Sequence, residues 1–136
     1  MNRLRLPIHK AKNLVIYQKG YRSDFYGDMD CNCDNSSCWY TLLDNNFVQK
    51  CFHIISMFKI RINRGFSCQA HNDSIKGAVK DSYHTIGSAW DIETAEEGKH
   101  DELLKECEKV FPFVYTRSYI DKNGNERIVI HCDWRG

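Results

Sequence analysis

The stretch that decides how this chain folds lies near its middle and reads Asp81-Ser82-Tyr83-His84-Thr85-Ile86-Gly87-Ser88-Ala89-Trp90-Asp91-Ile92-Glu93. Within it, His84 and Asp91 stand seven residues apart, with a glycine and small residues between them. Another histidine follows near the C-terminus, in Ile128-Val129-Ile130-His131-Cys132-Asp133-Trp134. Two imidazoles and one carboxylate form a three-ligand set for zinc that leaves a fourth position for water. A catalytic zinc activates water and polarises a carbonyl at such an open position.

Each of these residues taken alone also has a plainer interpretation. A single histidine on a mixed strand is usually a surface or hydrogen-bonded residue, and Asp91 and Gly87 could be ordinary turn residues. The order in which these residues occur together is more specific than any one of them alone. The pattern Ser-x-His-x-x-Gly-x-Ala-x-Asp-Ile over residues 82–92, followed by His-x-Asp at 131–133, resembles the zinc D-alanyl-D-alanine carboxypeptidase superfamily. That group includes phage and bacterial L-alanyl-D-glutamate endopeptidases and the hedgehog signalling domain.

Two further blocks are similar to phage-type members of that superfamily, namely Ile62-Asn63-Arg64-Gly65-Phe66-Ser67-Cys68-Gln69-Ala70-His71-Asn72 and the ending His131-Cys132-Asp133-Trp134-Arg135-Gly136. The resemblance runs from about residue 60 to the C-terminus, with a weaker similarity over residues 25–38. It implies a single α+β domain with a largely antiparallel sheet, helices packed on one side, and the fold of the hedgehog domain and the D-Ala-D-Ala peptidases.

The resemblance also implies roles for particular residues. It places the zinc ligands on His84, Asp91 and His131, and a substrate-contacting serine on Ser82. One departure from the family pattern concerns an arginine that helps to bind substrate. Serine occupies that position here, and Arg64, three residues earlier, is the candidate to replace it.

A second departure concerns the general base. Many members of the superfamily carry an acid three residues before the last histidine, where this chain has Ile128. The chemistry needs a carboxylate that takes a proton from the metal-bound water. Residues i and i+2 of a strand point to the same face, so Asp133 should project beside His131 and is the first candidate. Glu126, which precedes that strand, is the second.

The function that the resemblance implies is a zinc-dependent peptidase that cleaves peptidoglycan stem peptides. It would act as a D-Ala-D-Ala carboxypeptidase or an L-Ala-D-Glu endopeptidase. Two alternatives stay open on the same fold: a non-catalytic, zinc-stabilised binding module, as the hedgehog branch shows, and a phage structural protein. An acid within reach of the zinc-bound water distinguishes the enzyme from the binding module.

Length and composition limit the class of protein further. The 136 residues suit one domain over residues 1–136, with a core from about residue 40 and a cysteine-containing segment over 20–38. The chain has 19 Lys and Arg against 18 Asp and Glu and shows no basic stripe, which argues against nucleic acid as a partner. No apolar run approaches the roughly 20 residues of a membrane span. The N-terminus lacks the pattern of a secretory signal. We therefore expect a monomer that is cytoplasmic as made and acts on the cell wall after release, as a phage-encoded enzyme would.

Seven cysteines are many for this length, and their odd number without a signal peptide argues against a complete disulfide framework. Cys31, Cys33 and Cys38 gather in a polar loop, and Cys68 could approach them in the fold. A second, structural metal, reduced thiols and a disulfide all remain open there, because thiolates at short spacing suit zinc but the spacing is not a standard zinc-ribbon pattern. The other three cysteines are expected in the core or on the strand face away from His131: Cys51, Cys107 and Cys132.

Periodicity and turn residues predict the elements. Apolar residues at three- and four-residue spacing predict helices over residues 45–58, capped by Asp44, and over 99–110. A short helix is expected over 72–79. Strands are expected over 59–63, 88–93, 113–120 and 127–133, the last two joined by a turn at Asn123-Gly124. The short apolar run over 12–17 predicts an N-terminal strand or an ordered arm. Three aromatic residues flank the ligands and either line a substrate groove or, more commonly, bury one side of the sheet: Tyr83, Trp90 and Trp134.

Overall fold

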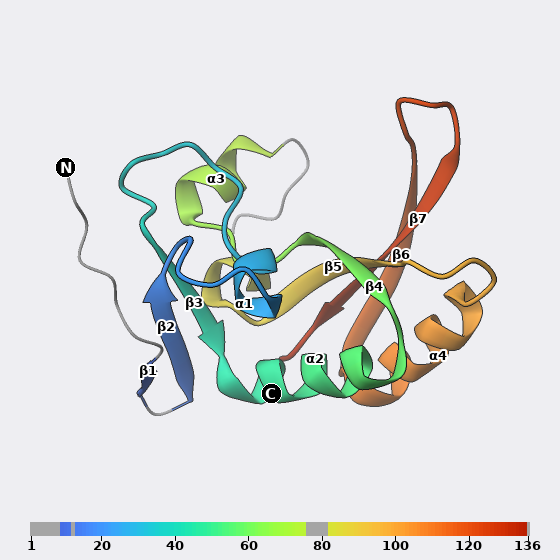
Figure 1. Ribbon diagram of the computed structural model, residues 1–136, viewed down its shortest axis with the longest axis horizontal. Coiled ribbons are helices and arrows are strands. Elements are labelled where there is room, and N and C mark those ends of the chain that lie inside the picture. The colour runs from blue at the N-terminus through green and yellow to red at the C-terminus, as the bar shows by residue number, and fades with distance from the viewer. Residues whose placement is uncertain (1–8, 12, 76–81, 136) are drawn as a thin grey trace.

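The chain folds into two antiparallel sheets with short helices around them, as the computed structural model shows for residues 9–11, 13–75 and 82–135 (Figure 1). The first sheet has the order β1-β2-β3, made by β1 (His9–Ala11), β2 (Leu14–Gln18) and β3 (Tyr40–Asp44). The second has the order β4-β5-β7-β6, made by β4 (Ile60–Arg64), β5 (Ala89–Thr94), β6 (Phe113–Ile120) and β7 (Glu126–Asp133). The β6–β7 hairpin extends at the end of the molecule opposite the three-stranded sheet.

The helices lie between these strands in the sequence: α1 (Phe25–Asp28), α2 (Asn45–Met57), α3 (Gln69–Ser74), the 3-10 helix η1 (Tyr83–Ile86) and α4 (His100–Val110). α2 begins where it was predicted because the side chain of Asp44 accepts a hydrogen bond from the backbone N–H of Phe47, at 3.0 Å. The buried residues of α2 and α4 recur at the helical spacing that places them on one face: Phe47, Val48, Cys51 and Ile54 in α2, and Leu103 and Cys107 in α4.

The main core lies between these two helices and one face of the four-stranded sheet. Trp90 is fully buried there, with its ring centroid 6.0 Å from that of Phe47 and 6.0 Å from that of Phe111. The even-numbered residues of β5 and β7 point into this core, among them Ile92, Ile130 and Cys132. Successive residues of a strand face opposite sides, so the odd-numbered residues turn their side chains to the other face of the sheet. That face carries two of the predicted metal ligands, Asp91 and His131.

The α+β fold with antiparallel sheets agrees with the prediction, and so do the positions of the two long helices and the final hairpin. The core also draws on the chain before residue 40, through Val15, Tyr17 and Met29. Within the described residues, no helix is long and apolar enough to cross a membrane.

The short helix predicted over 72–79 differs from the structure. α3 occupies residues 69–74, and residues 76–79 of the predicted helix lie outside the described part of the chain. The helix begins earlier because the sulfur of Cys68 accepts a hydrogen bond from the N–H of His71 and caps its first turn. Residue 12 of the strand or arm predicted over 12–17 also lies outside the described residues, and β2 runs one residue further, to Gln18.

Candidate active site

His84 is held by a tight turn pressed against β3. The hydroxyl of Ser82 accepts a hydrogen bond from the backbone N–H of His84, at 3.2 Å, and starts η1. Gly87 ends η1 with φ +70°, and its carbonyl accepts a hydrogen bond from the N–H of Asp44 at 2.9 Å. A side chain at Gly87 would overlap the backbone of Leu42 and Leu43. The glycine therefore permits both the left-handed turn and the close approach that set the position of His84.

Asp91 and His131 meet as a cross-strand pair. They stand directly opposite each other on β5 and β7, where side chains of one face lie within contact distance. The Nδ1 of His131 lies 2.8 Å from Oδ1 of Asp91, and the Nε2 of His84 lies 3.4 Å from the same oxygen. One ligand atom from each of the three residues lies within 4.8 Å of the others, and all three side chains are buried. We call His84, Asp91 and His131 the triad.

The hydrogen bonds behind the two histidines define how their rings face Asp91. The Nδ1 of His84 lies 2.8 Å from the carbonyl oxygen of Gly65, and the Nε2 of His131 lies 2.8 Å from Oδ2 of Asp133. A carbonyl oxygen only accepts, so Nδ1 of His84 carries a hydrogen, and the neutral ring presents Nε2 to Asp91. The ring of His131 lies between two carboxylates, with Nε2 at Asp133 and Nδ1 at Asp91. With a metal beside Asp91, Nδ1 of His131 would be the ligand atom and Asp133 would accept the hydrogen on Nε2.

The candidate ligand atoms of the triad, one from each residue, lie close together in a buried site. Burial lowers the pKa of His84, although its contact with Asp91 partly opposes this. Burial alone would raise the pKa of Asp91, but the hydrogen bonds and charges of His131 and His84 outweigh it and hold that pKa well below its usual range. Neutral imidazole and ionised carboxylate are the forms that bind a metal. Ligand atoms around a tetrahedral zinc lie roughly 3.3 Å apart. The His84–Asp91 separation is 3.4 Å, whereas the His131–Asp91 separation is 2.8 Å, so this second pair would move apart by about 0.5 Å to hold an ion. The triad therefore fits a zinc ion.

A cleft of about 510 Å³ opens beside Asp91. It is lined by residues from the loop before β3, from β4 to β7 and from α3: Asn32, Asn63, Arg64, His71, Ile75, Asp91, Arg117, Tyr119 and Val129. Two guanidinium groups border it next to the triad, and that of Arg117 lies 3.1 Å from Oδ2 of Asp91. A substrate in this cleft would meet two positive charges beside the metal ligands.

Comparison with known proteins identifies the family. The family model for Peptidase M15 matches residues 27–133, which include the whole triad. The chain belongs to the peptidase M15 family. M15 peptidases depend on zinc, in agreement with the geometry of the triad. No curated protein and no solved structure matches the chain.

The two acids predicted as bases occupy different places in this M15 peptidase. Asp133 is buried and lies against Nε2 of His131, the ring nitrogen that faces away from Asp91, and it also accepts a hydrogen bond from Nε of Arg135 at 2.7 Å. Glu126 is exposed at the far end of the hairpin, paired with Ile120. It stands five residues before His131 on β7, which corresponds to roughly 17 Å along the strand. The structure brings Asp133 to the triad and leaves Glu126 away from it.

Arg64 of the M15 peptidase borders the cleft beside the triad. Its Nε donates a hydrogen bond to the hydroxyl of Ser67 at 2.9 Å, and a terminal nitrogen donates to Oδ1 of Asn72 at 2.7 Å. The arginine and the serine have thus exchanged places in the sequence, while the guanidinium still borders the cleft. Burial lowers the pKa of Arg64, but an arginine keeps its charge in proteins.

Sequence reasoning missed the contribution of β6. Its odd-numbered residues face the triad side of the sheet, and the ring of Tyr115 stacks on that of His131 with centroids 4.6 Å apart. Arg117 follows two residues later, at the cleft. Of the predicted groove aromatics, Trp90 is buried in the core, whereas Tyr83 lies under the guanidinium of Arg135, 4.8 Å from its carbon. The alternation of side chains along the strand predicted at 113–120 could have placed Tyr115 and Arg117 on one face.

A buried carboxylate ties the strands around the cleft together. Glu93 accepts hydrogen bonds from Asn63 of β4 at 2.6 Å, Tyr119 of β6 at 2.9 Å and Arg127 of β7 at 2.9 Å. Burial would raise the pKa of Glu93, but these three donors lower it below its usual value. Glu93 is therefore a charged group that joins β4, β6 and β7, and its carboxylate is hydrogen-bonded to residues outside the triad.

Proposed function

We propose that this M15 peptidase uses zinc held by His84, Asp91 and His131 to cleave peptidoglycan stem peptides, as a D-Ala-D-Ala carboxypeptidase or an L-Ala-D-Glu endopeptidase. The observation that carries the proposal is the triad itself, with one nitrogen of each histidine ring and a carboxylate oxygen close together beside an open cleft. Zinc in a three-ligand site supplies an activated water and polarises the scissile carbonyl.

The arginines at the cleft support a substrate that carries carboxylates. A guanidinium binds a carboxylate through two parallel hydrogen bonds, which fixes the orientation of the bound group as well as its charge. Stem peptides offer such groups at the D-glutamate residue and at the terminal D-alanine. Arg64 is held rigidly by Ser67 and Asn72, whereas the side chain of Arg117 is 57 % exposed. Arg64 would therefore position the substrate, and Arg117 would adjust to it.

Two further residues have proposed roles beside the triad. Ser82 borders η1 and would contact substrate through its hydroxyl, as the family resemblance implies. Asp133 would position His131, because its carboxylate accepts the hydrogen on Nε2 and so keeps the Nδ1 lone pair toward the metal. The same carboxylate also forms an ion pair with Nε of Arg135, at 2.7 Å.

One observation favours a second candidate function, a zinc-stabilised binding module without catalysis. Isoleucine occupies position 128, where related enzymes carry an acid, and Asp133 is already engaged by His131 and Arg135. In this case the cleft would bind stem peptides and leave them intact.

The deciding experiment is digestion of purified peptidoglycan by zinc-loaded protein, with the products read by mass spectrometry. We expect release of terminal D-alanine or cleavage after L-alanine, and the bond that breaks identifies the activity. The His84→Ala variant, which lacks one triad ligand, should release nothing. Intact peptidoglycan after incubation with wild-type protein that binds it would refute the peptidase proposal and leave the binding module. An Arg64→Gln variant should raise KM for the cleaved fragment by about tenfold or more, as expected for a lost charged hydrogen bond.

A further inference from the structure

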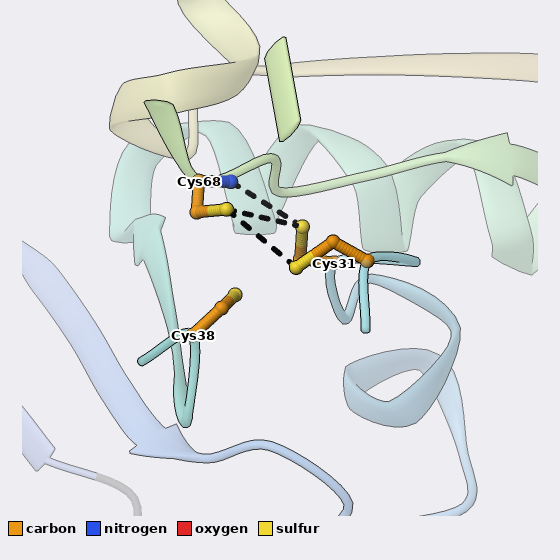
Figure 2. A group of neighbouring side chains, drawn as sticks. Cys31, Cys38 and Cys68 are labelled. Atoms are coloured by element: carbon orange, nitrogen blue, oxygen red, sulfur yellow. Dashed lines mark hydrogen bonds between the residues drawn. The ribbon is translucent and has the colours of Figure 1, made fainter. Parts of the chain in front are cut away.

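Four cysteines converge at a second place, away from the triad. Cys31, Cys33 and Cys38 come from the segment between α1 and β3, and Cys68 stands at the start of α3. Figure 2 shows Cys31, Cys38 and Cys68 with their side chains directed toward one another. The four sulfur atoms all lie within 4.8 Å of one another. We call these residues the thiol cluster.

The sulfur separations are those of a metal site. The Sγ of Cys68 lies 3.8 Å from that of Cys31 and 3.6 Å from that of Cys33. Four thiolates at about 2.3 Å from a tetrahedral zinc lie roughly 3.8 Å from one another, because a tetrahedron's edge is about 1.6 times its centre-to-corner distance. A disulfide would bring two sulfurs to about 2.0 Å, and all four cysteines are free.

The surroundings of the thiol cluster suit a negatively charged zinc–thiolate centre. Two backbone N–H groups donate to its sulfurs: that of Cys68 to Cys31 at 3.4 Å, and that of His71 to Cys68 at 3.4 Å. The ammonium of Lys19 donates to the carbonyl oxygen of Cys33 at 2.8 Å and lies 3.9 Å from its sulfur. Four thiolates and one divalent cation carry a net charge of −2, which these donors and the nearby ammonium would offset.

We propose that Cys31, Cys33, Cys38 and Cys68 hold a second zinc ion with a structural role. Soft thiolate ligands select zinc over hard cations such as magnesium and calcium. Four protein ligands complete the tetrahedron, so this ion has no open position for water and takes no part in catalysis. The proposal concerns a site separate from the triad and holds whether or not the triad proves catalytic.

The place of the thiol cluster in the fold explains what such an ion would do. It joins the segment between α1 and β3, which contains no helix or strand, to the chain just before α3. The N–H of Phe66 donates to the carbonyl of Met29 at 2.8 Å, and Gly65 approaches Met29 closely, so the two segments already run side by side. Asn32, between two of the cysteines, lines the cleft. The ion would therefore fix one wall of the cleft.

Metal analysis of purified protein tests the proposal without any measurement of activity. The protein is made with zinc in the medium and purified without chelators. We expect two zinc ions per chain in the wild type and one in the His84→Ala/His131→Ala variant, in which only the thiol cluster remains. In that variant, titration of the thiols with a mercurial reagent should release the remaining zinc. Cobalt in its place should give the near-ultraviolet charge-transfer absorption of thiolate ligation.

The matched cysteine variants are Cys33→Ser and Cys51→Ala. Cys33→Ser should lose one zinc ion, whereas Cys51→Ala removes a buried thiol outside the cluster and should keep both. If Cys33→Ser fails to fold, the mercurial and cobalt measurements on the protein with an intact cluster still test whether the cluster binds zinc. The proposal is overturned by a triad variant that holds no metal, by iron instead of zinc, or by a protein mass that is lower by two or four hydrogens, as disulfides would give. Zinc at the thiol cluster alone would support this proposal and refute the triad assignment.

Discussion

Replacing Asp133 by asparagine separates a positioning role from a proton-accepting role beside the triad. In the native protein, one carboxylate oxygen of Asp133 accepts from Nε2 of His131 and both accept from Arg135. Asparagine has only one acceptor oxygen, and its NH₂ group must face either the ring N–H or the guanidinium, both of which are donors. The side chain is 1 % exposed, so water cannot replace the lost bond. The variant therefore loses a charge and at least one buried hydrogen bond with little change in shape.

The two roles predict effects of different kinds. Loss of a carboxylate that orients a metal-bound histidine typically lowers metal affinity about 10- to 100-fold, which corresponds to roughly 1.4–2.7 kcal/mol. Loss of a general base typically lowers turnover about 100- to 10,000-fold and leaves the metal in place. Because Asp133 contacts the ring nitrogen that faces away from Asp91, we expect the first effect, with turnover at saturating zinc within about tenfold of wild type.

The assay combines two titrations. Competition with a chromogenic chelator gives the zinc dissociation constant, and hydrolysis of stem-peptide fragments at increasing zinc gives turnover at saturation. Glu126→Gln is the matched control, since it makes the same acid-to-amide change at the exposed end of the hairpin and should alter neither quantity. Unchanged zinc affinity with turnover reduced 100-fold or more would refute the positioning role and make Asp133 the base. A large effect of Glu126→Gln on turnover would contradict the placement of both acids.

Three further predictions follow from the same contacts. Gly87→Ala should lower the free energy of unfolding by roughly 2–5 kcal/mol, because the residue has a left-handed φ and the added methyl group would overlap the neighbouring backbone. Gly124→Ala should lower it by only about 1–2 kcal/mol, because Gly124 has φ +81° but open space around it. Equal losses for the two variants in urea titrations would contradict this prediction. Glu93→Gln should cost about 1–3 kcal/mol because it weakens three partly buried hydrogen bonds, and an unchanged melting temperature would show that these bonds contribute little to stability. Mild chelation that removes only the triad metal should abolish hydrolysis and leave the circular dichroism spectrum intact, because the three ligands stand on a packed sheet and turn; global unfolding would mean that this metal is structural.

Local sequence patterns were sufficient for much of the fold. The three- and four-residue spacing of apolar residues in α2, with Asp44 as its cap, predicted both the helix and its first residue. The Asn-Gly turn and the alternation on either side of it predicted the β6–β7 hairpin, and the pairing of Ile120 with Glu126 fits that turn. These signals work because each depends on residues that are neighbours in the chain.

Contacts between distant segments were harder to predict. Strand periodicity correctly placed Asp133 beside His131, but it cannot say which ring nitrogen the carboxylate meets, because that depends on the register of β5 against β7. Arg117 was missed since its proximity to Asp91 arises only when β6 pairs with β7. The short helix α3 began earlier than predicted because its cap is the sulfur of Cys68, an N-cap residue that sequence rules do not anticipate.

Residues 65–68 connect the two sites and give the thiol cluster a consequence for the triad. The carbonyl of Gly65 fixes the tautomer of His84, and the N–H of Ser67 donates to the carbonyl of the same histidine at 3.1 Å. The next residue is Cys68, a member of the thiol cluster. Loosening of Cys68 would therefore reach His84 through one hydrogen bond to its ring and one to its backbone carbonyl. If an ion holds the cluster, its removal should weaken zinc binding at the triad. Coupling between two sites is reciprocal, so removal of the triad zinc should weaken binding at the cluster by the same factor, and a one-sided effect in chelator titrations would refute this connection.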